Sequence, residues 1–520
     1  MELIQKHIHR NRMKSRATAQ MVLDDDFNVP DSKPDALRII SEMARIDLEQ
    51  KKALTGRLVL NGNLEFRVLY ATNEEDNRIQ CLKGRIPFEE TINMENLEER
   101  DEVEVRTQLE DLQVSLINSR KISIKAVLHF TAEARELYDE ELATDIETSE
   151  PVYTKKETVQ NLQLLAQKKD TFRVKEELTV ENTRPNIYEM LWEDVNFRQM
   201  EIRPVEGRLM IQGEMEVFLL YAGEEEGHGL QWLTKTFPVQ GEVDCQGATE
   251  GAICDIRCTP DHFEMTVAPD YDGEERVVHI EGILGLDIQI FEEEETDMLV
   301  DAYSTAKELT LKKEPGSWEK LLLNSDTRLR LNEKLNRSEN KAKIMQSCYG
   351  PATAQVDQVK QTAGILEISG NVMLSVLYVT AEEDVPFDSM KSKVPFTLNV
   401  EIPEVNEDCR IFVRCQVEQV ELSMNTTDQL EVKLGLSVHT MVLCKPDVNR
   451  VSDIEVSELD MRRLQELPGM VGYIVQNGDS LWEIAKENHT TVEKIQELNQ
   501  LSGNEIHKGQ KLVILKAVNQ

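Results

Sequence analysis

The stretch Gly56-Arg-Leu-Val-Leu-Asn-Gly-Asn-Leu-Glu-Phe-Arg-Val-Leu-Tyr70 alternates apolar and polar residues, and the chain contains this pattern three times. The second copy is Gly207-Arg-Leu-Met-Ile-Gln-Gly-Glu-Met-Glu-Val-Phe-Leu-Leu-Tyr221, and the third is Gly364-Ile-Leu-Glu-Ile-Ser-Gly-Asn-Val-Met-Leu-Ser-Val-Leu-Tyr378. A period of two places the apolar side chains on one face of a strand, which is typical of half-buried antiparallel sheets. The sequence therefore predicts a mainly β protein built from a repeated unit.

Further landmarks recur in the same register. The three tyrosines are separated by 151 and 157 residues, and the same separations relate the central glycines and three later prolines: Gly62, Gly213, Gly370, Pro87, Pro238 and Pro395. A repeat of this length is a whole domain and not one turn of a solenoid. We predict three tandem antiparallel β domains, sandwich or barrel-like, at residues 1–137, 155–298 and 305–444.

Each unit also has a leader segment. Pro34, Pro185 and Ala342 lie 28 residues before the repeat glycine, and the residues from 36 to 45 have helical spacing of apolar side chains. A proline suits the first turn of a helix, so one short helix is predicted in each unit. The glycine within the apolar stripe predicts a bulge or a sharp bend in the sheet.

Composition limits the classes of function. Lys and Arg number 59 and Asp and Glu number 96, which gives a net charge of −37. This charge argues against nucleic acid and anionic membranes as partners, because both require clustered cations. The sequence shows no apolar run long enough to span a membrane and no signal peptide, and its eight Cys are too sparse for a disulfide scaffold. We expect a soluble, multi-domain protein of the cytosol.

After a linker at residues 445–470, the pattern changes. Residues 471–516 predict strand, helix, helix, strand, with Gly509 beginning the return strand. Ser480 followed by Glu483 has the spacing of a capping box, and so has Thr490 followed by Glu493. Apolar side chains at helical spacing follow both caps.

Residues 471–516 resemble a LysM domain through Gly478-Asp-Ser-Leu-Trp-Glu-Ile-Ala485, Asn499-Gln-Leu501 and Gly509-Gln-Lys-Leu512. The resemblance implies a shallow groove for N-acetylglucosamine polymers such as peptidoglycan. Its two walls would be formed by Gly478, Asp479, Ser480 and Leu481, and by Leu501, Ser502, Gly503 and Ile506. Asp479 and Ser480 can alternatively serve as helix caps, and for Trp482 we favour a place in the core.

The three repeats are similar to a sporulation-specific domain of unknown function that occurs in tandem in endospore-forming bacteria. Three such units followed by a LysM domain resemble a spore coat morphogenetic protein of the Clostridium type. The resemblance implies a protein of the mother-cell cytoplasm that links the coat to the basement-layer ATPase at the forespore surface.

Sequence signals for catalysis are weak. Cys254 and Cys258 lack a second pair with zinc spacing, and Cys81 aligns with Trp232 and Ser389 in the other repeats, so it is no shared nucleophile. We therefore expect no catalytic residues, no metal site and no cofactor. Two functions stay open. One is a non-enzymatic structural adaptor whose LysM domain docks a partner protein, and the alternative is a peptidoglycan-binding, cell-wall-associated protein or hydrolase.

Overall fold

The computed structural model describes the chain except for residues 75–77, 225–228, 363, 404–408, 461–467 and 517–520. The first repeat consists of long antiparallel strands: β1 (Glu2–Asn28), β2 (Arg38–Leu54), β3 (Arg57–Ala71), β4 (Ile79–Asn93), β5 (Val103–Asn118) and β6 (Lys121–Glu147). They form two sheets, with strand orders β1-β6-β5 and β2-β3-β4. The predicted mainly β fold of three tandem domains is confirmed.

The other two repeats follow the same order. The second contains β7 (Val152–Thr179), β8 (Ile187–Val205), β9 (Arg208–Gly223), β10 (Leu230–Asp244), β11 (Ile253–Pro269) and β12 (Glu275–Ser304). In the third, three of the equivalent strands are each interrupted, which gives β13 (Lys307–Pro315), β14 (Lys320–Asn336), β15 (Ile344–Tyr349), β16 (Ala352–Thr362), β17 (Ile365–Thr380), β18 (Phe387–Glu401), β19 (Cys409–Thr426), β20 (Gln429–Cys444) and β21 (Asn449–Glu458).

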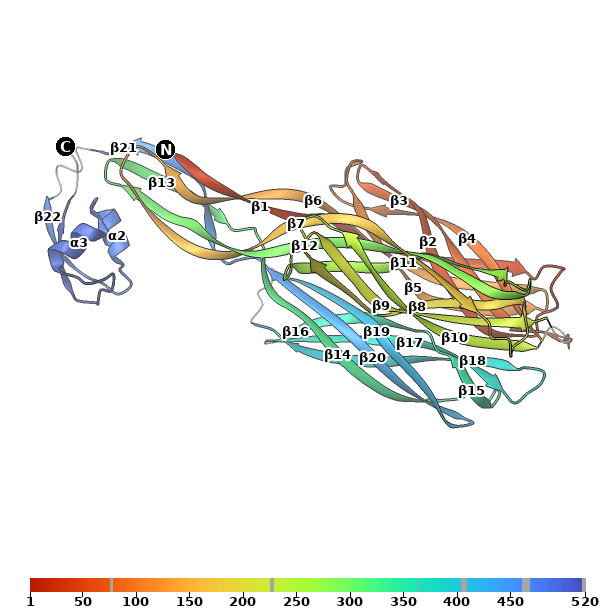
Figure 1. Cartoon of the computed structure of the whole chain (residues 1–520). Helices are drawn as coiled ribbons and strands as arrows, with labels where there is room; N and C mark the ends of the chain where they lie inside the picture. Colours follow the sequence, from red (N-terminus) through yellow and green to blue (C-terminus); the bar gives the residue numbers. More distant parts are fainter. Residues whose placement is uncertain (75–77, 225–228, 363, 404–408, 461–467, 517–520) are drawn as a thin grey trace.

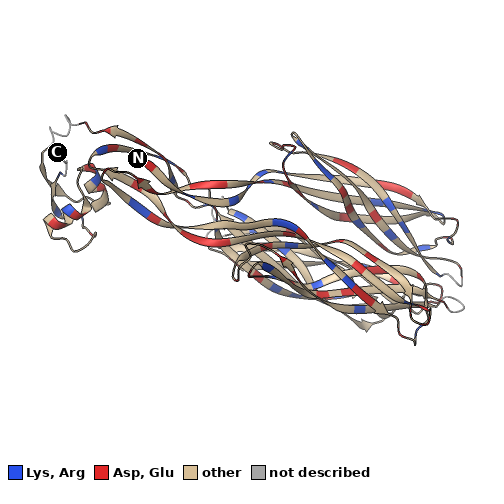
Figure 2. Cartoon of the chain, turned by 45° about the horizontal axis from the view of Figure 1, so that its top comes forward, with Lys and Arg blue, Asp and Glu red and all other residues tan. Residues whose placement is uncertain are grey.

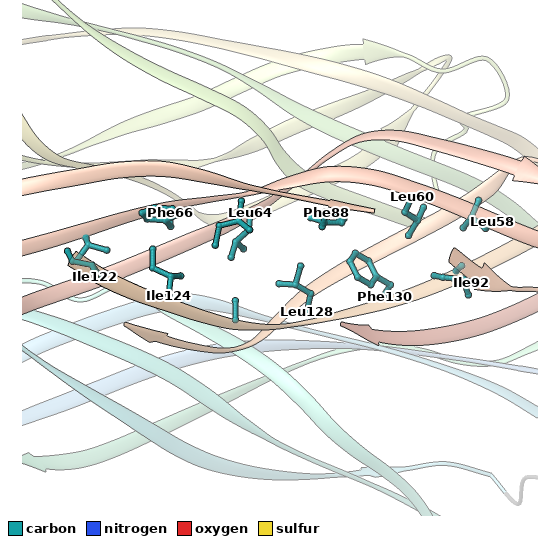
Figure 3. Packing of buried hydrophobic residues seen from close by; sticks show 14 of the residues in the cluster. Leu58, Leu60, Leu64, Phe66, Phe88, Ile92, Ile122, Ile124, Leu128 and Phe130 are labelled. Carbon is teal, nitrogen blue, oxygen red and sulfur yellow. The ribbon is translucent and has the colours of Figure 1, made fainter. Parts of the chain in front are cut away.

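The core of each repeat lies between its two sheets. In the first repeat, Figure 3 shows apolar side chains of β3, β4 and β6 that meet in this space, among them Phe66, Phe88 and Phe130. Phe88 and Phe130 come from opposite sheets, and their ring centroids are 5.6 Å apart. The alternation in the sequence therefore marks the inner face of a β-sandwich.

The repeated tyrosine has one role in all three copies. Tyr70, Tyr221 and Tyr378 are fully buried. Their hydroxyl groups donate to the backbone carbonyls of Pro34, Pro185 and Ala342 at 3.4, 3.3 and 3.2 Å. The hydrogen bond satisfies a buried polar group and ties the leader segment to the sandwich, which explains why the tyrosine and the leader keep a fixed separation.

The repeated glycine lies beside a bulge, as predicted. The register of the neighbouring strand shifts opposite or directly next to Gly62, Gly213 and Gly370. A Cβ at Gly62 would lie 2.3 Å from the carbonyl oxygen of Asp47, and one at Gly370 would lie 2.1 Å from that of Gln355. A side chain therefore has no room where the bulged strand approaches.

The predicted short helix of each repeat is wrong. The segments that follow Pro34, Pro185 and Ala342 form strands β2, β8 and β15. Ile39 packs into the core of the first repeat, whereas Ile40 packs into a cluster shared by all three repeats. Apolar residues on both faces of a strand break the period of two and imitate helical spacing, which accounts for the error.

Three pairs of strand ends form a common stem. The first half of β1 pairs with the end of β6, the first half of β7 pairs with the end of β12, and β13 pairs with β21. Ala143, Leu299 and Val451 from the three repeats share one buried cluster there. Figures 1 and 2 show these strands leaving the sandwiches towards the C-terminal domain. The boundary expected at residue 137 falls inside β6, and β21 occupies part of the expected 445–470 linker.

The sandwiches also pack against one another around a shared apolar cluster. Ile40 and Leu69 of the first repeat meet Phe218 of the second and Tyr349 of the third, and the rings of Phe218 and Tyr349 stack with centroids 4.2 Å apart. Polar contacts between repeats also recur. Lys83 pairs with Glu193 across the first and second repeats, and at the equivalent positions Lys391 pairs with Glu42 across the third and first. The three repeats thus form a ring with approximate threefold symmetry.

Candidate functional site

The C-terminal domain carries the candidate site. Strands β22 (Met470–Ile474) and β23 (Lys511–Leu515) pair, and helices α2 (Leu481–Glu487) and α3 (Val492–Asn499) lie between them in the chain. Its core contains Val475, Leu481, Ile484, Ala485, Ile495, Leu512 and Ile514. The strand, helix, helix, strand order predicted from the sequence is confirmed.

Helix caps determine the geometry of the loop before α2. Ser480 is the N-cap, its hydroxyl accepts from the backbone N–H of Glu483 at 3.2 Å, and the reciprocal bond from the Ser480 N–H to the Glu483 carboxylate completes the predicted capping box. The second cap differs from the prediction, because Thr491 and not Thr490 is the N-cap of α3. The hydroxyl of Thr491 accepts from the backbone N–H of Lys494 at 3.2 Å, so the cap lies one residue later than predicted.

Asp479 has a structural role in the same loop. Its carboxylate accepts from the Tyr473 hydroxyl at 2.8 Å and from the backbone N–H of Gln476 at 2.7 Å. The hydrogen bond to Asp479 raises the pKa of Tyr473, so the phenol remains a donor at neutral pH. Gly478, with φ of 98°, lies exposed before it. Local bonds therefore fix the first predicted wall of the groove.

The residues of the candidate site divide into two groups. Leu481 is buried in the core, and Leu501 and Ile506 are half-buried against that core. Ser502 and Gly503 are exposed. A Cβ on Gly503 would meet nothing within 4 Å, and its φ lies outside the left-handed region. Because the exposed pair adds nothing to the core, it can be changed without opening a cavity.

Trp482 faces the stem, which the sequence did not predict. Its indole N–H donates to the carboxylate of Asp301 at 2.7 Å, and its ring packs edge-on to Tyr303 with centroids 4.9 Å apart. Lys486, one turn later on α2, pairs with the same carboxylate at 2.6 Å. Asp301 and Tyr303 lie on β12 of the second repeat. One face of α2 is therefore fixed to the stem, about 180 residues away in sequence.

Among the described residues, no group of three or more His, Cys, Asp or Glu side chains is arranged to hold a metal ion. Cys254 and Cys258 lie half-buried on β11, and burial raises the pKa of each thiol to about 11, so both stay protonated at neutral pH. Although the sparse cysteines argued against a disulfide scaffold, Cys409 and Cys444 form a disulfide between β19 and β20.

No helix in the described part of the chain is long and apolar enough to cross a membrane. This finding agrees with the absence of a long apolar run in the sequence.

Comparison with known families identifies both kinds of domain. The model of the SipL SPOCS domain matches three times, at residues 35–117, 186–268 and 344–425, and the LysM model matches residues 473–515. No curated protein and no solved structure gave a significant match. Neither matched domain is a catalytic module. The chain thus contains three tandem SPOCS domains followed by a C-terminal LysM domain.

Proposed function

We propose that this protein is a non-enzymatic structural adaptor of the spore envelope, in which the ring of three repeats is the scaffold and the LysM domain is the docking module. The observation that carries the proposal is that two sides of the LysM domain differ in their contacts. The stem holds α2 through Trp482 and Lys486, whereas the loop containing Ser502 and Gly503 remains exposed. A LysM domain that is fixed to the stem on one side and exposed on another can connect the scaffold to a partner.

The proposed partner is a protein, and the basement-layer ATPase of the spore coat is the candidate that the domain order suggests. This would place the chain in the mother-cell cytoplasm at the forespore surface. Ser502, Gly503, Asn504 and Glu505 form a run of exposed residues that a partner can approach. Leu501 and Ile506, half-buried at either end of this run, offer apolar surface beside it.

The test uses the full-length protein and the purified ATPase. We expect Ser502→Arg and Gly503→Asp to abolish capture of the ATPase while circular dichroism stays unchanged. Gly472→Asp is the matched control, because Gly472 is also an exposed glycine with nothing within 4 Å of an added Cβ. The adaptor role of the LysM loop is wrong if both loop variants still capture the ATPase while the wild-type interaction requires only the repeats.

Peptidoglycan is the second candidate ligand, because LysM domains typically bind such polymers. In this case, the wild-type protein would sediment with purified cell-wall sacculi, and the same two loop variants would remain in the supernatant. Measuring reducing ends released from the sacculi tests the hydrolase alternative. Release above the buffer control that is lost on changing one carboxylate of the chain would contradict the adaptor proposal.

A further inference from the structure

The threefold arrangement of the repeats makes their three junctions comparable, and one junction contains a cleft. A cavity of about 610 Å³ opens between the third and first repeats. Its charged lining consists of Lys334, Arg337, Lys341, Lys391 and Glu42. The lining therefore has four cations and one carboxylate, whereas in the whole chain acidic residues outnumber basic ones by 96 to 59.

Ion pairs within the junction leave positive charge in excess. Lys391 pairs with Glu42, Arg337 pairs with Asp428, and the fully buried Asp388 pairs with both Lys341 and Arg38. Lys334 forms no ion pair with any described residue, and its side chain is exposed. Glu431 lies opposite Lys334 on β20, so these five cations and four carboxylates leave one positive charge at the cleft of a protein whose net charge is −37.

Comparison of the repeats shows that this charge is particular to the third one. The residues equivalent to Lys334 are Asp26 on β1 and Glu177 on β7, at the same separations as the repeated tyrosines. Each occupies the same place near the end of the first long strand of its sandwich. The third repeat therefore has a lysine where its sister repeats have a carboxylate.

Three edge strands meet around the cleft, and the carbonyl of Ile40 on β2 already accepts from the Ser389 hydroxyl. The lining residues come mainly from β2, β14 and β18, and each of these is an edge strand in its sheet. Edge strands carry backbone N–H and C=O groups that can pair with an added strand. Apolar side chains also line the cleft: Ile39, Ile40, Val114, Leu335 and Met390.

We propose that the cleft between the third and first repeats binds an extended acidic peptide segment of a partner protein, in which carboxylates alternate with apolar side chains. The carboxylates would meet Lys334 and its neighbouring cations, and the alternate apolar side chains would enter the cleft. An edge strand would supply backbone hydrogen bonds, which favours a peptide over a sugar polymer or a bare polyanion as the ligand.

The test begins with selection of random dodecapeptides, displayed on phage, on the immobilised full-length protein. Selected peptides are then synthesised with a fluorescein label, and their dissociation constants are measured by fluorescence anisotropy. We expect enrichment of sequences that alternate Asp or Glu with Val, Ile or Leu. Binding should weaken about tenfold in Lys334→Glu and should also weaken as salt is raised.

The control variant is Arg330→Glu, which makes the same charge change at an exposed position on β14 outside the cleft. Lys334→Glu places a second carboxylate opposite Glu431, so Lys334→Gln, which removes the charge without a like-charge pair, is measured beside it and should weaken binding in the same direction. Ser502→Arg should leave peptide binding unchanged, which separates this site from the LysM loop.

The proposal is overturned by three results. The first is a selection without any binder that depends on Lys334, and the second is equal weakening by Arg330→Glu. The third is binding of polyphosphate or soluble peptidoglycan fragments with the same dependence on Lys334, since charge alone or a glycan would then explain the cleft.

Discussion

The contact between Asp301 and α2 makes a quantitative prediction for Asp301→Ala. The Asp301 carboxylate accepts one hydrogen bond from the Trp482 indole at 2.7 Å and one from Lys486 at 2.6 Å. Its side chain is 18% exposed, so solvent weakens these bonds only in part. Hydrogen bonds to a charged group contribute about 1.5–3 kcal/mol each, and we expect a loss of about 2–4 kcal/mol of docking free energy after this exposure is considered.

A loss of this size changes the ratio of docked to undocked LysM domain by roughly 30- to 1,000-fold, because about 1.4 kcal/mol corresponds to a factor of ten. Hydrogen–deuterium exchange measures the change in this ratio of docked to undocked domain directly. The stem covers the side of α2 that bears Trp482, and undocking should accelerate exchange in α2 and at Tyr303, while the sandwiches keep their protection. Asp297→Ala is the matched control, because Asp297 lies on the same strand and is exposed.

The pKa of Asp301 adds a pH test. Burial opposes ionisation of this carboxyl group, but hydrogen bonds from Lys486 and Trp482 outweigh burial and hold its pKa below the ordinary value. A depressed carboxylate pKa stabilises docking above the ordinary value, and this stabilisation is lost as the pH falls through the lowered pKa. Docking should therefore persist throughout the neutral range. Unchanged exchange of α2 in Asp301→Ala, or equal acceleration in Asp297→Ala, would refute this reasoning.

Three further predictions concern the stability of the scaffold. Trp318 is fully buried at the base of the stem and donates to the carbonyl of Gln160 at 3.1 Å, so Trp318→Ala should lower the free energy of unfolding by about 3–5 kcal/mol in urea denaturation. Gly370→Ala should cost about 1–3 kcal/mol in the same assay, because the added Cβ would meet a backbone carbonyl at 2.1 Å. Burial raises the pKa of Asp194 to about 6, so the contribution of Asp194 to stability should fall as the pH rises from about 4 to 6. Asp194→Asn should remove this pH dependence of the melting temperature in thermal melts, and an unaltered pH dependence would contradict the assignment.

The sequence by itself determined several features that depend on local pattern. The alternation from Gly56 to Tyr70 identified the inner face of a sandwich, because a strand turns successive side chains to opposite sides. The fixed separations identified three copies of one domain. Ser480 and Glu483 predicted a cap that the structure contains, since a capping box involves residues only three apart.

Only the tertiary structure decided how the repeats meet. The leader segments are strands because Ile39 and Ile40 pack against different partners, and a spacing pattern cannot distinguish two buried faces from one helical face. The stem, the contact of Asp301 with Trp482 and the cleft beside Lys334 each join residues more than 100 positions apart. Such contacts depend on the mutual orientation of whole sheets, which neither residue of a pair encodes locally.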